Sequence, residues 1–227
     1  MPAPTIRFSF DYISTNAYIA WTQLPALAAT YGHTIDPIPV LFAGLLEAHG
    51  TLGPAEVPMK ALWMAKNNAR KAARLGIPLN PPAFHPFNPL LALRASSLPL
   101  APADRVRLID ALFKAVWVRG LHVSDPAVVD AVADEIGLDG ARVVAEAQAP
   151  DAKARLRKQT EEAIARGVFG VPSMEVGDEL FWGYDDFPYL EPHLAGRDLL
   201  EVSEWAKWGA APQPSAMRRR FRSPGTS

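Results

Sequence analysis

Hydrophobic and polar positions alternate strictly at the start of the chain. The apolar positions are Ile6, Phe8, Phe10 and Tyr12, and the residues between them are polar. A period of two is typical of a β-strand. Residues 14–16 (STN) are all good helix caps, and the apolar-rich segment that follows predicts a helix ending at Gly32. Segment 34–42 predicts a second strand, and its two prolines favour an edge position or an interrupted start.

The middle of the chain changes to helical periodicity, and strands return near its end. Helices are predicted at 58–75, 103–120, 125–137, 139–148 and 151–166, with a proline-rich loop at 78–89. Strands at 168–176 and 179–182 flank the turn Gly177-Asp178, which indicates a hairpin. A last helix is predicted at 185–194.

This order of elements predicts an α/β fold in which a thioredoxin-like domain carries an inserted all-helical subdomain. The thioredoxin-like domain is expected at 5–45 and 168–204, and the helical insertion at 46–167. A flexible basic tail is expected at 205–227, because this segment is rich in Pro, Ser and Arg and holds no acidic residue.

The composition of the chain excludes several classes of protein and of binding site. Hydrophobic residues make up 49% of the chain and charged residues 21%, which is typical of a globular protein. The net charge of −1 gives nucleic acid no global attraction, and no apolar run approaches the ~20 residues of a membrane span. No export signal is recognisable, so a cytoplasmic location is expected. The five histidines lack metal-binding spacing, so no metal site is expected.

The chain contains no cysteine. This excludes disulfides, thiolate metal sites, a cysteine nucleophile and dithiol redox chemistry carried by the chain itself. Any sulfur chemistry must therefore use a thiol that another molecule supplies.

Three constellations could carry chemistry, and each also has a purely structural interpretation. Ser14 can donate its hydroxyl to an anion at a helix N-terminus, or can simply cap the helix. Val171-Pro172 can form a binding loop, or an ordinary strand entry. The third constellation is a stripe on the predicted helix 58–75 that can bind a carboxylate, or form a solvated basic face with Trp63 turned into the core. Its members are Lys60, Trp63, Asn67 and Arg70.

Several segments resemble the 2-hydroxychromene-2-carboxylate isomerases and kappa-class glutathione transferases, which share a DsbA-like thioredoxin fold. They are FSFDYISTNAYIAW at 8–21, the stretch 49–94, the step Val171-Pro172, and FWGYD at 181–185. In the family, a serine at the position of Ser14 replaces the Cys-x-x-Cys motif of redox relatives. The chain departs from the family at Thr15, where proline is usual, at Thr51, where asparagine is common, and at Asn67, where aspartate is usual.

The resemblance implies a glutathione-dependent isomerase that acts on a small conjugated aromatic carboxylate by reversible thiolate addition. It implies that Ser14 is the catalytic residue and stabilises the glutathione thiolate. The residues implied to bind glutathione are Asn16, Thr51, Lys60, Val171, Pro172, Tyr184 and Asp185, with Val171 pairing with its backbone and Asp185 meeting its γ-glutamyl amino group. Trp63 and Arg70 are implied to contact the substrate. A homodimer is a family expectation.

Two alternatives remain open at this point. In a kappa-class-like transferase the thiolate adduct would be the product. In a non-catalytic thioredoxin-like binding module, Ser14 would only cap its helix.

Overall fold

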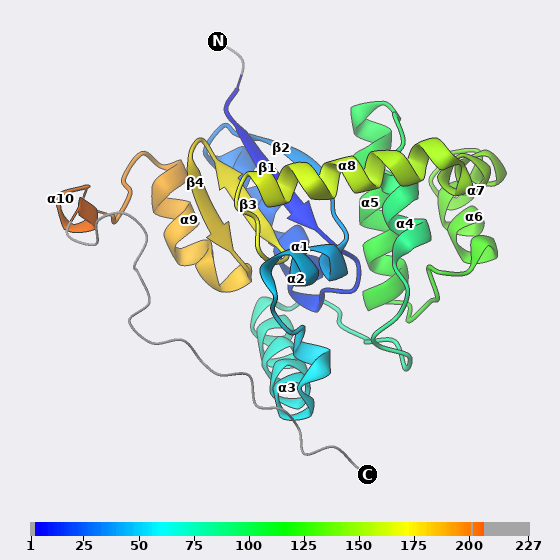
Figure 1. Cartoon of the computed structure of the whole chain (residues 1–227), viewed down its shortest axis with the longest axis horizontal. Helices are drawn as coiled ribbons and strands as arrows, with labels where there is room; N and C mark the ends of the chain where they lie inside the picture. The colour runs from blue at the N-terminus through cyan, green and yellow to red at the C-terminus, as the bar shows by residue number, and fades with distance from the viewer. Residues whose placement is uncertain (1–2, 201, 207–227) are drawn as a thin grey trace.

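A four-stranded mixed sheet lies at the centre of the computed structural model, which describes residues 3–200 and 202–206 (Figure 1). Its strands are β1 (Thr5–Phe10), β2 (Thr34–Pro39), β3 (Ser173–Val176) and β4 (Glu179–Trp182), in the order β2-β1-β3-β4. β1 and β2 are parallel, whereas β3 is antiparallel to both β1 and β4. The edge position predicted for the proline-containing strand is confirmed, since β2 borders only β1. A proline in an edge strand need not remove a ladder hydrogen bond, because one side of the strand has no partner.

Helices cover both faces of the sheet. On one face, Phe8 and Phe10 of β1 pack against α1 (Thr15–Thr30) and α5 (Pro102–Trp117); the ring centroids of Phe10 and Phe113 are 5.3 Å apart. On the other face, α2 (Phe42–His49) and α8 (Pro150–Ala165) contribute Leu45 and Ala163 to a smaller apolar cluster. Ser9 lies among the polar positions of the alternating pattern, yet it is fully buried as well because helices lie on both sides of the sheet.

The helices inserted between β2 and β3 form two groups (Figure 1). α4 (Leu90–Ser96) and α5 pack with α6 (Pro126–Glu135) and α7 (Gly140–Gln148), and α8 leads from this group back to the sheet. α3 (Pro58–Leu75) lies apart from them and contacts α1. The predicted helices at 58–75, 103–120, 125–137, 139–148 and 151–166 are confirmed as α3 and α5–α8, with small shifts at their ends.

The sequence patterns missed or misplaced several elements. α2 begins at Phe42, where a strand was expected to end, and α4 was not predicted. β3 begins at Ser173 rather than at residue 168, because the chain bends at residues 170–172, where Ser173 Oγ donates a hydrogen bond to the Gly170 carbonyl (2.8 Å). The predicted last helix begins with a 3₁₀ turn at Tyr184–Asp186 and continues as α9 (Phe187–Leu194).

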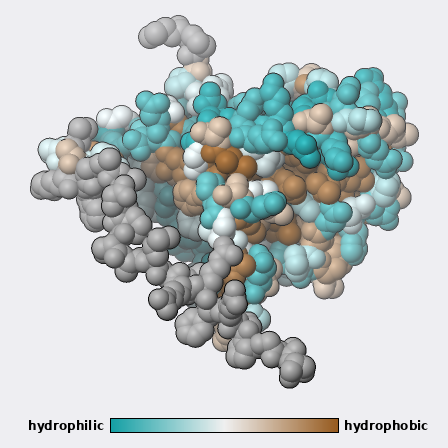
Figure 2. All heavy atoms as spheres, in the orientation of Figure 1, coloured by the Kyte–Doolittle hydropathy of each residue, from teal (hydrophilic) through white to brown (hydrophobic). Residues whose placement is uncertain are grey.

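The remaining elements are a 3₁₀ turn at Pro54–Glu56 and α10 (Val202–Trp205). Within the described residues, no helix is long and apolar enough to cross a bilayer. Figure 2 shows hydrophobic residues gathered across the middle of one face, below the hydrophilic surface of α8. Most of the predicted basic tail, residues 207–227, lies outside the described residues.

Candidate active site

Ser14 lies between the end of β1 and the first turn of α1. Its backbone is extended, with φ −91° and ψ 111°, and its Oγ accepts a hydrogen bond from the Ala17 N–H at 3.2 Å. The structural interpretation of Ser14 as an N-cap is therefore correct. The amide groups of the first helical turn point out of the helix here and favour an anion.

The Ser14 hydroxyl also faces the loop before β3. Its Oγ donates to the Val171 carbonyl oxygen across 3.4 Å, a long hydrogen bond between residues 157 positions apart. The peptide bond between Val171 and Pro172 is cis. The structure thus brings together Ser14, Val171 and Pro172, three of the residues that sequence analysis singled out.

A second group of three side chains joins α1, α3 and the turn after β4. Lys71 Nζ lies 3.0 Å from Asn16 Oδ1 and 2.6 Å from Asp185 Oδ2. The Lys71 side chain is 9% exposed, whereas that of Asp185 is 67% exposed. Asn16 and Asp185 were both predicted to bind glutathione, and Lys71, which the sequence analysis missed, connects them.

Asp11 is buried directly behind the Ser14 loop. Its carboxylate accepts hydrogen bonds from the backbone N–H groups of Ile13 (3.1 Å) and Phe42 (2.9 Å), so it ties this loop to the start of α2. Burial raises the pKa of the Asp11 carboxyl to about 7, although the two N–H groups act in the opposite direction. A carboxyl that titrates near neutral pH therefore supports the loop that carries Ser14.

The proline-rich loop predicted at 78–89 also reaches the site. His85 Nε2 lies 2.9 Å from the carbonyl oxygen of Ile13, the residue before Ser14. Tyr18 Oη, in the second turn of α1, donates to the Pro78 carbonyl oxygen at 2.7 Å. The loop is thus fixed against the start of α1 at two points.

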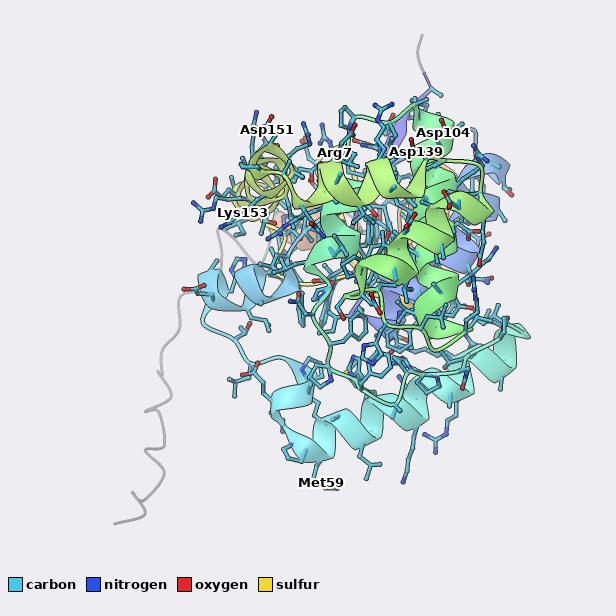
Figure 3. All side chains as sticks on the ribbon, turned by 90° about the vertical axis from the view of Figure 1, so that its right-hand side faces the viewer. Arg7, Met59, Asp104, Asp139, Asp151 and Lys153 are labelled. Atoms are coloured by element: carbon cyan, nitrogen blue, oxygen red, sulfur yellow. The ribbon has the colours of Figure 1, made fainter. Side chains whose placement is uncertain are left out.

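The other predicted residues form no such cluster. Tyr184 packs against Phe187, with ring centroids 4.9 Å apart. The remaining four are exposed, and none has a side-chain hydrogen bond to another described residue: Thr51, Lys60, Trp63 and Arg70. Trp63 does not turn into the core, since it is 60% exposed. Figure 3 shows Met59, on the same helix, at the outer edge of the molecule.

The buried face of α3 is displaced by one position from the predicted stripe. Its buried residues are Asn68, Lys71 and Ala72, which lie beside the predicted stripe and were not part of it. The sequence offered little indication of which face of α3 is buried, because the face that packs on α1 contains polar residues. A buried lysine cannot be distinguished from an exposed one by hydrophobic periodicity, and only the positions of Asn16 and Asp185 reveal it.

The matching family model is the DsbA-like thioredoxin domain, which covers residues 5–195. The chain is 33% identical over 194 residues to the 2-hydroxychromene-2-carboxylate isomerase of Sphingobium xenophagum, covering 84% of this chain and 97% of that protein. It is 25% identical over 207 residues to a kappa-class glutathione transferase of Caenorhabditis elegans, covering 84% and 91% of the two chains.

A solved structure of a 2-hydroxychromene-2-carboxylate isomerase superposes with a TM-score of 0.79 at 30% identity, covering 85% of this chain and 95% of that one. The thioredoxin-like fold with its helical insertion is therefore confirmed, as is the resemblance read from the sequence. The chain belongs to the DsbA-like thioredoxin family, and within it to the enzymes that comprise the 2-hydroxychromene-2-carboxylate isomerases and the kappa-class glutathione transferases.

Proposed function

We propose that the protein is a glutathione-dependent isomerase that acts on a conjugated aromatic carboxylate. The observation that carries the proposal is the position of Ser14, whose hydroxyl lies at the N-terminus of α1 and faces the Val171 carbonyl. The identity to 2-hydroxychromene-2-carboxylate isomerases supports the reaction class. A cytoplasmic location and a homodimeric state remain predictions.

The residues at this position fit a bound thiolate. The hydrogen bond from Ser14 Oγ to Val171 is long and can be exchanged for one to an anion. The N–H groups of Thr15 and Asn16 have no hydrogen-bond acceptor among the described residues. A thiol with an ordinary pKa of ~8.5 ionises more readily next to such donors and the positive end of a helix dipole.

Glutathione would lie across the Val171-Pro172 loop, between the Ser14 turn and Asp185. Bound there, it would supply a thiolate that adds reversibly to the conjugated substrate and so allows rotation about a former double bond. The protein contributes position and charge: Ser14 holds the negative charge, and Asp185 accepts the γ-glutamyl ammonium. Asn16, Thr51 and Tyr184 complete the proposed glutathione site.

The exposed stripe of α3 is proposed to face the substrate. Lys60 and Arg70 are cations whose side chains have no hydrogen-bond partner among the described residues, and Trp63 offers an exposed aromatic face. An aromatic carboxylate requires both kinds of contact. Lys60 would bind a carboxylate of glutathione or of the substrate.

Glutathione-dependent turnover of 2-hydroxychromene-2-carboxylate tests the proposal. We expect isomerisation with reduced glutathione and none with S-methylglutathione, which keeps the tripeptide but lacks a free thiol. Reduced glutathione at 100 times its Kd should stabilise the protein by about 2.7 kcal/mol. The absence of both turnover and a rise in Tm at saturating glutathione would reject the function proposed here.

A glutathione transferase is the second candidate, since kappa-class enzymes are among the relatives. The same residues would hold the thiolate, but its adduct would be released as the product. Incubation with a chloronitroarene separates the two functions: a transferase accumulates a stable glutathione conjugate, whereas an isomerase leaves glutathione unconsumed.

A further inference from the structure

The buried lysine of α3 lies on the carboxylate that the proposed function assigns to glutathione. Lys71 Nζ is 2.6 Å from Asp185 Oδ2, and its side chain is 9% exposed. A buried ammonium needs compensating partners, and Lys71 has Asp185 and the Asn16 amide oxygen. The three residues come from three separate elements, so the arrangement depends on the complete fold.

Both members of the ion pair retain unused hydrogen-bonding capacity. The Lys71 ammonium has three N–H donors, of which two are engaged by described residues. A carboxylate can accept at both oxygens, and only Oδ2 of Asp185 has a hydrogen-bond partner among the described residues. Because the Asp185 side chain is 67% exposed, a ligand can approach the pair from solvent.

A buried acceptor lies one turn away. Asn68 is 4% exposed and occupies the face of α3 that carries Lys71, three residues earlier. Its Oδ1 is buried and has no hydrogen-bond partner among the described residues. Buried polar atoms are normally paired, so this face of α3 keeps one acceptor without a donor among the described residues.

We infer that Lys71 and Asp185 together recognise an α-amino acid headgroup, so that Lys71 determines specificity for the γ-glutamyl end of glutathione. This inference rests on the proposed function. Oδ1 of Asp185 accepts the α-ammonium of the ligand, and the free N–H of Lys71 donates to its α-carboxylate. The two ligand groups are attached to one carbon atom, which suits two adjacent protein charges of opposite sign.

The charges explain the specificity. Without a ligand, Lys71 and Asp185 neutralise each other. A zwitterionic headgroup adds one charge of each sign and keeps the site neutral, whereas an amine without a carboxylate places a second cation beside Lys71. Like charges in a partly desolvated site oppose binding, and the Lys71 N–H would lack its acceptor. The site should therefore discriminate against a glutathione analogue that lacks only the α-carboxylate.

A structural interpretation of Lys71 makes a different prediction. If Lys71 only ties α3 to α1 and to the turn after β4, its removal lowers the Tm but affects both ligands alike. If Lys71 only competes with the ligand ammonium for Asp185, its removal tightens binding of both ligands. In neither case does the ratio of the two affinities change.

The test measures the Kd of reduced glutathione and of γ-aminobutyryl-cysteinyl-glycine, the analogue without the α-carboxylate, by calorimetry. The variants are wild type, Lys71→Met and the control Lys66→Met, which removes an exposed lysine from the same helix. We expect wild type and Lys66→Met to prefer glutathione by ~10- to 100-fold, the size of one charge-assisted hydrogen bond. Lys71→Met should bind both ligands with similar affinity.

Each other outcome overturns the inference in a recognisable way. A wild-type ratio near one rejects it without any variant, so the test survives if Lys71→Met does not fold. An unchanged ratio in a folded Lys71→Met protein also rejects it, and leaves the proposed glutathione function intact. If wild type binds neither ligand, the proposed function itself fails and the inference fails with it.

Discussion

Ser14 Oγ and the Val171 carbonyl oxygen lie 3.4 Å apart, although 157 positions separate the two residues in the chain. The contact joins the N-terminus of α1 to the loop before β3. It therefore links the part of the chain that forms β1 and β2 to the part that forms β3 and β4. It places a hydroxyl donor beside helix-terminal amides that have no acceptor in the described part of the chain, which is the arrangement on which the proposed function depends.

Replacement of Ser14 by alanine should separate its two roles. The loss of the N-cap should lower the free energy of unfolding by about 1 kcal/mol. The loss of the hydroxyl should raise the pKa of the bound glutathione thiol towards its ordinary value of ~8.5. The thiolate absorbance of the complex, titrated against pH, measures the second effect.

Ser14→Thr keeps a capping hydroxyl and is the matched control. It should retain most of the stability and leave the thiol pKa low. A thiol pKa that is the same in the wild type and in Ser14→Ala would show that the hydroxyl does not stabilise the thiolate.

Asp11 should make stability depend on pH below neutrality. Burial raises the pKa of its carboxyl to about 7, whereas an unfolded chain has an aspartate pKa of ~3.9. Between these values the folded protein binds the extra proton, so the contribution of Asp11 to stability is complete below pH ~4 and is lost as the pH rises to about 7. The total change is on the order of 4 kcal/mol.

Asp11→Asn removes this titration while keeping one amide oxygen for the Ile13 or Phe42 N–H. We expect the difference in unfolding free energy between wild type and Asp11→Asn, measured in urea, to shift against the wild type as the pH rises from ~4 to ~7. A difference that is constant across this range would contradict the raised pKa.

The ion pair between Arg166 and Glu175 should contribute to stability through the burial of the acid. Arg166 Nε lies 2.7 Å from Glu175 Oε1, and the Glu175 side chain is 8% exposed. Arg166→Met leaves a buried carboxylate unpaired, and we expect a loss of about 2–4 kcal/mol in chemical denaturation. The figure lies at the low end of buried pairs because the Arg166 side chain is 30% exposed.

Two further variants check the cause. Arg142→Met disrupts the exposed pair with Glu146 and should cost less than ~1 kcal/mol. Adding Glu175→Gln to Arg166→Met should restore part of the stability, because a neutral amide is cheaper to bury than a carboxylate. Equal losses at Arg166 and Arg142 would show that burial of Glu175 is unimportant.

The elements that sequence alone predicted are those with clear local signals. The alternation at residues 6–12 identified β1, and proline and glycine delimited α3 at Pro58 and Gly76. α2 was missed because Phe42 continues an apolar segment that also suits a strand. The hydrophobic periods of a helix and of a strand cannot be distinguished over so few residues.

The residues of the candidate site also fall into two groups, those that local sequence features identify and those that only the fold reveals. Ser14, Asn16, Val171 and Asp185 could be selected because turns, helix starts and family motifs are local features of the chain. Lys71 and Asp11 could not, because nothing near them in sequence distinguishes a buried charge from an exposed one. Their roles follow from partners on other elements: Asn16 and Asp185 for Lys71, and Phe42 for Asp11.

The sequence by itself determined the order of the four strands and of most helices, the absence of a cysteine thiol, and the resemblance that indicates chemistry on the thiol of another molecule. Hydrophobic period and capping are properties of neighbouring residues, so they can be identified without a fold. Only the tertiary structure decided which charges meet and which carboxyl is buried enough to titrate near neutrality. Those properties depend on distance and desolvation between residues far apart in the chain, which local patterns do not encode.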